Sequence, residues 1–288
     1  MDYIQALLRN ASPPFNKIGA RPMTNHLQQI CAANAELLAA QQATLSFAEL
    51  WQQAVDLPPA RDFLAALQRN IAAGQAAVIA EMKRKSPSGG EIRADFDPVS
   101  LAASYQQGGA AALSILTEAR WFGGRLEDIA AVRASGCPLP ILRKDFTLAP
   151  YHIAQARVTG ADAVLLIVAA LSDAVLSECL DAAQQLGMTV LVEVHDAAEL
   201  AQALRHQPRL VGINNRNLKT LKTDLSTTLT LAPTVQGDIT LVAESGLKSA
   251  QDLSACRHIG VHSFLIGEHL LRQPNPGIGL REILGGGG

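Results

Sequence analysis

The chain has 288 residues, a net charge of −2 at pH 7 and 48% hydrophobic residues. This length suits one domain with a modest extension and excludes a second full enzyme domain. Acidic and basic residues are interspersed, so we expect no nucleic-acid partner, and no segment approaches the ~18 apolar residues of a membrane span. The composition predicts a globular protein with a large core and no membrane partner.

The four cysteines, Cys31, Cys137, Cys179 and Cys256, are widely separated in the sequence. They form no CxxC pair and have no nearby histidine at the spacing of a zinc site, so no metal site is predicted. We interpret them as reduced packing residues of a cytoplasmic protein. The N-terminal segment MDYIQALLRNASPPF lacks the basic start and apolar run of an export signal.

Residues 1–75 are predicted to form a helical extension that caps the main domain. The segments MTNHLQQICAANAELLAAQQ (23–42) and SFAELWQQAV (46–55) favour one long and one short helix. Proline pairs at Pro13–Pro14 and Pro58–Pro59 bound the parts of this extension. The extension is too short to be an independent enzyme domain.

Short runs rich in Val, Ile and Leu recur at regular spacing from residue 76 onward, and each is predicted to be a buried parallel strand. The eight runs are AAVIAEMK (76–83), ALSILT (112–117), PILRKD (140–145), AVLLIV (163–168), TVLVEV (189–194), LVGINN (210–215), TLVAES (240–245) and SFLIGE (263–268). Helical segments separate them. One starts at Asp97-Pro98 and stops at Gly108–Gly109, and another has Ser172 as N-cap and Gly187 as its stop.

Eight such units predict an α/β fold, a (β/α)8 TIM barrel over residues 76–284, preceded by the N-terminal helical extension. A doubly wound open sheet is the alternative, but it usually carries a phosphate loop after its first strand, and no GxGxxG follows strand 1. Residues 285–288 are predicted to be a flexible Gly tail.

Polar residues gather at the carboxyl ends of these strands, where the active site of a parallel barrel forms. They are Glu81, Lys83, Lys144, Asp145, Glu193, Asn214, Asn215, Arg216, Glu244 and Ser245. Buried charges need partners, so we expect acids and bases from different strands to pair around the barrel axis. The alternative is a set of salt bridges that only closes this end of the barrel.

Residues two apart on a strand point the same way, so Glu81 and Lys83 should be neighbours, and Asn214 and Arg216 should share a side.

Two glycine-containing tripeptides, ESG (244–246) and IGE (266–268), end the last two strands. Barrels often hold a phosphate there with loop amides, so Ser245, Gly246 and Gly267 are candidate phosphate-binding residues. The segment KRKSPSGG (83–90) suits a mobile loop that closes on an anionic substrate through Lys83 and Ser86, with a solvated turn as the alternative.

Several of these segments together resemble one enzyme family. AEMKRKSPSGG, ALSILTEARWFGG, PILRKDF, GADAVLLI, LVEVH, GINNRNL and VAESG resemble indole-3-glycerol-phosphate synthase, in the order of that family and from about Met23 to Leu271. PPARDF (58–63) extends the likeness into the predicted extension. The resemblance implies conversion of 1-(2-carboxyphenylamino)-1-deoxyribulose 5-phosphate to indole-3-glycerol phosphate, with loss of carbon dioxide and water, in tryptophan biosynthesis.

The resemblance also implies roles for individual residues. Lys144 matches the general acid, Glu193 the general base, and Glu81 and Lys83 the supporting acid and cation. Asn214, Glu244 and Ser245 match further catalytic positions, and phosphate is expected near Ser245, Gly246, Gly267 and the amide of Glu268. No cofactor is implied. Many members read SPSKG where this chain has Gly89, so the loop lacks one lysine, for which Lys85 is a candidate substitute.

The chemistry explains why these residue types are needed. Attack of an aromatic carbon on a ketone needs a proton donor for the oxygen, and the Lys144 ammonium is a better acid if burial or Lys83 lowers its pKa. Dehydration needs an acid and a base, and we assign the base to Glu193 with Glu81 as helper or alternative.

Two aromatic residues in matching motifs, Phe122 and Phe146, are expected to form an apolar slot for the benzoate ring, with ordinary packing as the alternative. Arg216 is a further predicted substrate-binding residue, whereas His152 and His195 are expected to be surface or structural residues. We expect a monomer. Phosphoribosylanthranilate isomerase and a catalytically silent phosphosugar-binding barrel are the rival interpretations. The isomerase would ordinarily use a Cys–Asp pair at the corresponding strand ends, and no such pair appears. A silent barrel would lack at least one acid–base residue, and all are present.

Overall fold

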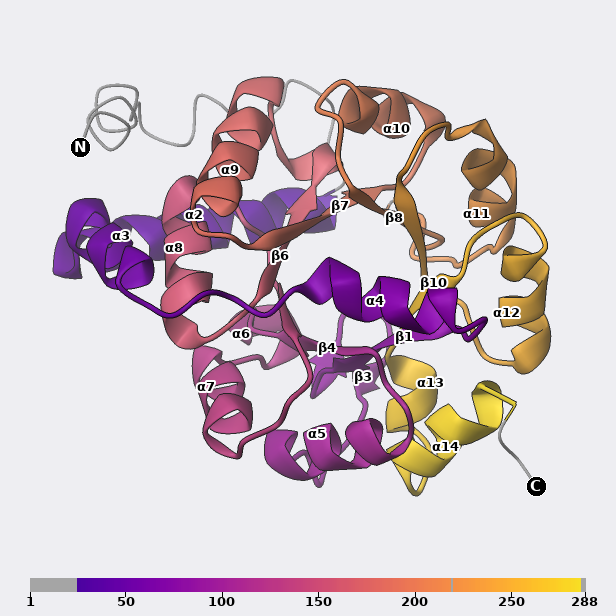
Figure 1. Cartoon of the computed structure of the whole chain (residues 1–288). Helices are drawn as coiled ribbons and strands as arrows, with labels where there is room; N and C mark the ends of the chain where they lie inside the picture. The colour runs from indigo at the N-terminus through magenta and orange to yellow at the C-terminus, as the bar shows by residue number, and fades with distance from the viewer. Residues whose placement is uncertain (1–24, 219, 286–288) are drawn as a thin grey trace.

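Eight parallel strands close into a barrel in the computed structural model, which describes residues 25–218 and 220–285 (Figure 1). The barrel strands are β1 (Ala77–Met82), β4 (Ala112–Leu116), β5 (Ile141–Lys144), β6 (Ala163–Ile167), β7 (Thr189–Val194), β8 (Leu210–Asn214), β9 (Thr240–Glu244) and β10 (Ser263–Ile266). Each lies within one of the eight predicted runs, so the prediction of a TIM barrel is confirmed.

The barrel closes where the first strand meets the last. β1 pairs in parallel with β4, with Ile79 opposite Ala112, and on its other side with β10, with Ala77 opposite Ser263. Every other strand pairs with its neighbours in chain order. All eight carboxyl ends therefore meet at one mouth of the barrel.

Helices surround the strands, as Figure 1 shows. They are α5 (Pro98–Gln107), α6 (Ala119–Phe122), α7 (Leu126–Ala134), α8 (Pro150–Thr159), α9 (Asp173–Gln185), α10 (Ala197–Leu204), α11 (Ser226–Leu231), α12 (Ala250–Arg257), α13 (Glu268–Leu271) and α14 (Pro276–Ile283). Two 3-10 turns, η2 (Val168–Ala170) and η3 (Ala232–Thr234), complete the set. The predicted caps are confirmed, because Asp97 accepts from the amide of Ser100 and Ser172 from that of Val175.

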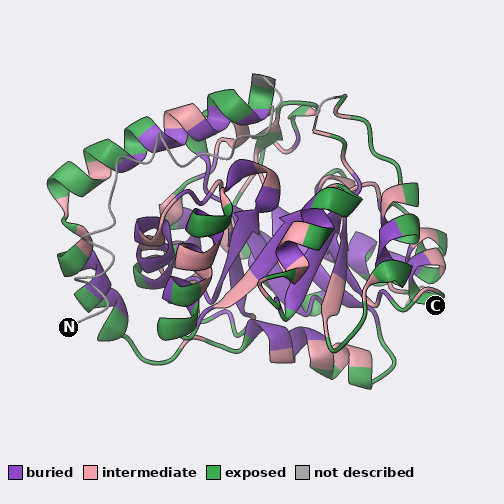
Figure 2. Cartoon of the chain, turned by 90° about the horizontal axis from the view of Figure 1, so that it is seen from above, coloured by how far each residue is buried: buried purple, intermediate pink, exposed green. Residues whose placement is uncertain are grey.

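The hydrophobic core is built mainly from strands that are buried on both faces. β1, β4, β6 and β10 consist entirely of buried residues, and Figure 2 shows the buried positions concentrated on the barrel strands and the inward faces of the helices. Burying each large aliphatic side chain contributes about 1.5–3 kcal/mol, so this core supplies the main stabilisation. A rigid barrel wall is the result.

The N-terminal extension contains three helices among the described residues, α2 (Asn25–Thr44), α3 (Phe47–Val55) and α4 (Phe63–Ala72). The sequence predicted the first two and missed α4, although Asp62 caps it by accepting from the amide of Ala65 at 2.8 Å. α2 runs at the catalytic end of the barrel, where Leu27 lines the cavity described below, and α3 packs on α8. α4 ends just before β1 and crosses in front of the barrel in Figure 1.

A cluster of paired polar groups lies behind β5, and we call it the outer cluster: Asn34, Thr117, Arg143, Asp145, His152 and Gln155. The Arg143 guanidinium donates to Asp145 (2.9 Å), Thr117 (3.1 Å), Gln155 (2.9 Å) and the carbonyl of His152 (3.1 Å). Asp145 also accepts from the Thr117 hydroxyl at 2.5 Å and from the Asn34 amide of α2 at 3.3 Å. The outer cluster ties the extension to the end of β5.

All four cysteines lie in the described part of the chain and are buried free thiols, as expected of packing residues. Among the described helices, none combines the length and apolar character needed to span a bilayer. The predicted Gly tail lies outside the described residues, apart from Gly285.

Candidate active site

A cavity of about 820 Å³ opens at the carboxyl ends of the barrel strands. All but one of the predicted site residues line it: Glu81, Lys83, Phe122, Lys144, Phe146, Glu193, Asn214, Arg216, Glu244, Ser245, Gly246, Gly267 and Glu268. The exception is Ser86. The barrel therefore brings together residues from seven of its strands and the loops that follow them.

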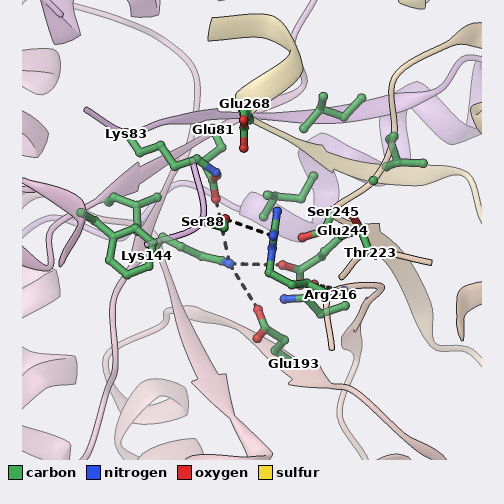
Figure 3. Close-up of a pocket in the computed structure, with 18 of the residues that line it drawn as sticks. Glu81, Lys83, Ser88, Lys144, Glu193, Arg216, Thr223, Glu244, Ser245 and Glu268 are labelled. Carbon is green, nitrogen blue, oxygen red and sulfur yellow. Dashed lines mark hydrogen bonds and ion pairs between the residues drawn. The ribbon is translucent and has the colours of Figure 1, made fainter. Parts of the chain in front are cut away.

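Lys144 lies at the centre of a group of charges that we call the inner cluster: Glu81, Lys83, Lys144, Glu193 and Glu244. The Lys144 ammonium is 3.2 Å from Glu193 Oε2, 3.2 Å from Glu244 Oε2 and 4.0 Å from Glu81 Oε2 (Figure 3). These side chains come from β5, β7, β9 and β1, so only a closed barrel assembles them. The expected pairing of acids and bases around the barrel axis is observed.

The protonation state of Lys144 depends on the three surrounding carboxyl groups. Burial disfavours the ammonium, but Glu244, Glu193 and Glu81 outweigh burial and raise the pKa of Lys144. The sequence had suggested that a lowered pKa would serve the acid role, and the structure shows the opposite direction. Lys144 is therefore held fully protonated at neutral pH.

Two of the carboxylates are held ionised. Burial opposes ionisation of Glu193, but Lys144 and His195 outweigh it and lower the Glu193 pKa well below its ordinary range. Burial likewise opposes ionisation of Glu81, and the nearby Lys83 and Lys144 lower its pKa. The inner cluster thus supplies two carboxylates that can accept protons.

Glu244 differs from them. Burial and the negative charge of Glu193 outweigh the attraction of Lys144 and raise the Glu244 pKa to about 8. Its Oε1 atom is buried against Gly212 and has no hydrogen-bond partner among the described residues. At neutral pH Glu244 is mostly a neutral acid that can donate a proton.

Glu81 and Lys83 are neighbours, as the strand alternation predicted. The Lys83 ammonium lies 2.5 Å from Glu81 Oε1, and the Tyr105 hydroxyl donates to the Glu81 carbonyl at 3.2 Å. Gly267 follows the adjacent strand β10 and packs so closely on Glu81 that a Cβ there would overlap the carboxylate. A side chain at position 267 would therefore displace Glu81.

The end of β8 contributes Asn214 and Arg216. Asn214 Oδ1 accepts from the amide of Arg216 at 3.0 Å, and the Arg216 guanidinium donates to the Ser88 hydroxyl at 3.1 Å. Asn215 points elsewhere, because its side chain accepts from Thr228 and donates to the carbonyl of Ser245. Asn215 therefore links the loop after β9 to α11, whereas Asn214 and Arg216 line the cavity.

The predicted phosphate end of the cavity has an unusual backbone. Ser245 has φ +67° and Gly246 has φ +78°, so both are in the left-handed region, which is costly for serine. Gly267 and Glu268 approach from β10, and Arg272 pairs with Glu268 at 2.8 Å. Strain in a loop beside a cavity is typical of a ligand-binding backbone.

The loop after β1 forms a hairpin, β2 (Lys85–Ser86) with β3 (Gly90–Glu91). The Ser86 hydroxyl accepts from the amide of Gly89 at 3.0 Å, and Ser88 lines the cavity in its place. Lys85 donates to the carbonyl of Arg120 at 2.9 Å and does not line the cavity, so it does not occupy the place of the missing lysine.

Two phenylalanines form an aromatic wall. The ring centroids of Phe122 and Phe146 are 6.2 Å apart, at an interplanar angle of 37°. Phe122 is positioned by Glu118, whose buried carboxylate accepts from the amides of Arg120, Trp121 and Phe122. Trp121 stacks under the Arg120 guanidinium and does not line the cavity.

The two histidines considered from the sequence both have structural contacts. Burial lowers the pKa of His152 to about 4, and its Nδ1 accepts from the amide of Leu148. His195 contacts the inner cluster, because its Nε2 lies 3.2 Å from Glu193 Oε1. The sequence predicted a surface or structural role for His195, and its spacing of two residues from Glu193 was the signal that it could contact that carboxylate.

The cavity contains acids, bases and an aromatic wall, and the described residues include no cluster of three His, Cys, Asp or Glu that could hold a metal. An ammonium beside two ionised carboxylates and one neutral carboxyl can deliver and remove protons within one site.

Comparison with known proteins places this chain in a family. A family model described as indole-3-glycerol phosphate synthase matches residues 27–283. The indole-3-glycerol phosphate synthase of Acidovorax sp. (strain JS42) is 48% identical over 265 residues, which cover 91% of this chain and 99% of that protein. That of Acidithiobacillus ferrooxidans (strain ATCC 53993 / BNL-5-31) is 47% identical over 261 residues, with the same coverage.

Solved structures show the same fold at lower identity. A 3-hexulose-6-phosphate synthase has a TM-score of 0.59 and 14% identity, covering 73% of this chain and 99% of that one. The tryptophan synthase subunit alpha from Legionella pneumophila str. Paris has a TM-score of 0.57 and 14% identity, covering 78% and 97%. These structures support the barrel alone. The family model spans residues 27–283, and the two relatives are 47–48% identical over 91% of the chain. The chain therefore belongs to the indole-3-glycerol phosphate synthase family.

Proposed function

We propose that this chain closes the indole ring of indole-3-glycerol phosphate from 1-(2-carboxyphenylamino)-1-deoxyribulose 5-phosphate, with Lys144 as the general acid. The observation that carries the proposal is the Lys144 ammonium, held 3.2 Å from both Glu193 and Glu244 in the cavity. The family membership and the aromatic wall beside this ammonium support the same reaction.

In the first step, the aromatic carbon attacks the ketone and the ketone oxygen takes up a proton. Lys144 supplies this proton, because the surrounding carboxylates keep it charged, and a developing alkoxide is more basic than an amine. Loss of carbon dioxide then restores the aromatic ring. Lys83, paired with Glu81, offers positive charge toward the substrate anion.

Dehydration needs one acid and one base. Glu193 is ionised and accepts the ring proton, whereas Glu244 is mostly neutral and donates a proton to the departing hydroxyl. The different pKa directions of these two carboxyls support this division. Glu81 is the helper that holds Lys83, and Asn214 orients the substrate hydroxyl groups.

The substrate would lie across the cavity. The benzoate ring fits the wall of Phe122 and Phe146, and Arg216 can pair with its carboxylate. The phosphate fits the backbone amides of Ser245, Gly246, Gly267 and Glu268, at the two strands where barrels often bind phosphate. Ser86 stays a predicted contact for a closed loop, since Ser88 holds that position in this structure.

We also propose that the protein works as a cytoplasmic monomer. The buried free thiols suit a reducing compartment.

The test is the appearance of indole fluorescence when the purified protein meets the carboxyphenylamino-deoxyribulose phosphate. Lys144→Ala should lower kcat by about 10²–10⁴-fold, the usual contribution of a general acid. Lys248→Ala is the matched control, because Lys248 also lines the cavity but lies outside the inner cluster. Circular dichroism checks that each variant is folded.

A folded wild-type protein without fluorescence would refute the proposal and favour a silent phosphosugar-binding barrel. Equal losses in Lys144→Ala and Lys248→Ala would refute the specific acid role of Lys144.

A further inference from the structure

We propose that His195 is a positioning residue that holds and polarises the Glu193 carboxylate through a buried triad of Glu193, His195 and Glu199. This inference deepens the proposed function and rests on the assignment of Glu193 as the base. It concerns a side chain that does not line the cavity and acts only through Glu193.

The imidazole ring of His195 bridges two carboxylates. Its Nε2 lies 3.2 Å from Glu193 Oε1, and its Nδ1 lies 3.0 Å from Glu199 Oε2. All three side chains are less than a tenth exposed. Such a bridge keeps the ring from turning, because rotation would break both contacts.

The geometry favours a charged ring. A neutral imidazole has one N–H, so its other nitrogen would direct a lone pair at a carboxylate oxygen about 3 Å away. The imidazolium is hydrogen-bonded to Glu199 through Nδ1 and forms an ion pair with Glu193, although Nε2 makes no hydrogen bond among the described residues. Burial disfavours this cation, but contacts with Glu193 and Glu199 outweigh burial and raise the His195 pKa to about 10.

Glu199 is itself held at the start of α10. Its Oε2 accepts from the amide of His195 at 2.8 Å, and its own amide donates to Asp196 Oδ1 at 2.8 Å. Asp196 is the N-cap of α10. The first turn of α10 therefore fixes Glu199, Glu199 fixes the ring, and the ring fixes Glu193.

The two oxygens of Glu193 have separate partners as a result. Oε1 faces His195, and Oε2 faces Lys144 from β5 at 3.2 Å. The other charged groups near this carboxylate are Glu244 on β9 and Glu81 on β1. With His195 in place, Oε2 stays directed at the reacting centre, and the cation behind Oε1 keeps Glu193 ionised against these two neighbours.

The first test compares His195→Gln with the wild type over a pH range. A small displacement of a catalytic group can cost about 100-fold in rate, so we expect kcat to fall by about 10- to 100-fold with KM nearly unchanged. The acidic limb of the kcat profile should move up by about one pH unit, because an opposite charge at this distance lowers a carboxyl pKa by about 1–3 units. A purely structural role would not move this limb.

His206→Gln is the matched control, since His206 also contacts a carboxylate, Asp173 at 3.4 Å, but lies on the outside of the barrel. Its kinetics should match the wild type. Glu199→Gln should have a smaller effect than His195→Gln in the same direction, because the ring stays in place but loses one anionic neighbour.

The second test measures the protonation state of the His195 ring by NMR of histidine-labelled protein. The signal that is absent in His195→Gln assigns the resonance. The His195 ring of the wild type should stay doubly protonated well above pH 7, and in Glu199→Gln its titration should move to lower pH. Titration near the ordinary value of 6.5 in the wild type would overturn the inference, as would wild-type kinetics in His195→Gln.

The two tests distinguish failure of the proposed function from failure of the inference about His195. If the wild type makes no indole product, the proposed function fails, and the NMR titration still decides whether the charged triad exists.

Discussion

Two buried charge clusters are built from consecutive residues of β5, and they have opposite characters. Arg143 and Asp145 point into the outer cluster, where each guanidinium nitrogen has an acceptor. Lys144 points to the opposite face of the strand, into the inner cluster, which has three carboxyl groups and two ammoniums and opens on the cavity. One oxygen of Glu244 has no hydrogen-bond partner among the described residues.

The difference separates groups that stabilise from groups that react. A buried charge with every hydrogen bond made is held in one state, and removing its partner is costly. A buried charge with unequal partners has a shifted pKa and can exchange a proton during reaction. The following substitutions test whether the outer cluster stabilises the fold while the inner cluster takes part in the reaction.

The largest expected effect is the loss of stability in Asp145→Ala. This change leaves the buried Arg143 without its carboxylate, and breaking such a pair costs about 3–5 kcal/mol of unfolding free energy. Urea denaturation followed by circular dichroism measures the loss. Lys248→Ala provides a reference for an ordinary substitution, and a free energy of unfolding near that of the wild type in Asp145→Ala would mean that the outer cluster is not structural.

Gly267→Ala should have the next largest effect, on the inner cluster. The added Cβ would overlap the Glu81 carboxylate and push it from Lys83, so we expect kcat to fall by about 100-fold. The free energy of unfolding should change less than in Asp145→Ala. Gly260→Ala is the control for replacing a glycine away from the cavity, because its added Cβ would meet open space. Full activity in Gly267→Ala would contradict the close approach.

Glu244→Gln should change the pH dependence of stability. The folded-state pKa of Glu244, about 8, exceeds its ordinary value of 4.5, so its contribution to stability is complete below pH 4.5 and is lost as the pH rises through 8. The wild type should therefore lose stability relative to Glu244→Gln across this window, by at most about 1.4 kcal/mol per pH unit for one proton. Urea denaturation at several pH values measures this, and parallel pH curves would refute the raised pKa.

Phe122→Leu should have the smallest effect. The change keeps an apolar side chain but removes the aromatic contact with Phe146, so we expect KM to rise a few-fold, with a loss of about 0.5–1.5 kcal/mol in binding. Steady-state kinetics measure the change, and kcat should stay close to that of the wild type. A fall in kcat alone would show that the ring aligns the reacting atoms instead of binding the benzoate group.

The sequence predicted most of the barrel because each strand is an apolar run bounded by turn signals. The first and third strands each end one residue before the predicted Lys83 and Asp145, because pairing stops where polar residues enter the loops. The short helix α4 was missed, since it lies between a proline-rich linker and the first strand. Its start could have been found from Asp62, a good N-cap residue.

The inner cluster was predicted because strand ends converge at one mouth of a barrel. Its proton distribution was not, because the pKa of Lys144 depends on distances to carboxylates on three other strands. The contact of His195 with Glu193 was not predicted, for a related reason. It follows the last residue of β7, and only the structure shows that its ring still faces the side of Glu193. Ser88 was missed because the hairpin of the loop determines which serine faces the cavity.

Closure of the barrel by β1 and β10 has a consequence for how the protein gains activity during folding. Glu81 lies on the first barrel strand, and Glu244 lies on the seventh, so their meeting at Lys144 is a contact of very long sequence separation. Such contacts form late, since distant segments must first come together. Enzyme activity in a refolding experiment should therefore lag behind helix formation and report the moment at which the ring of strands is complete.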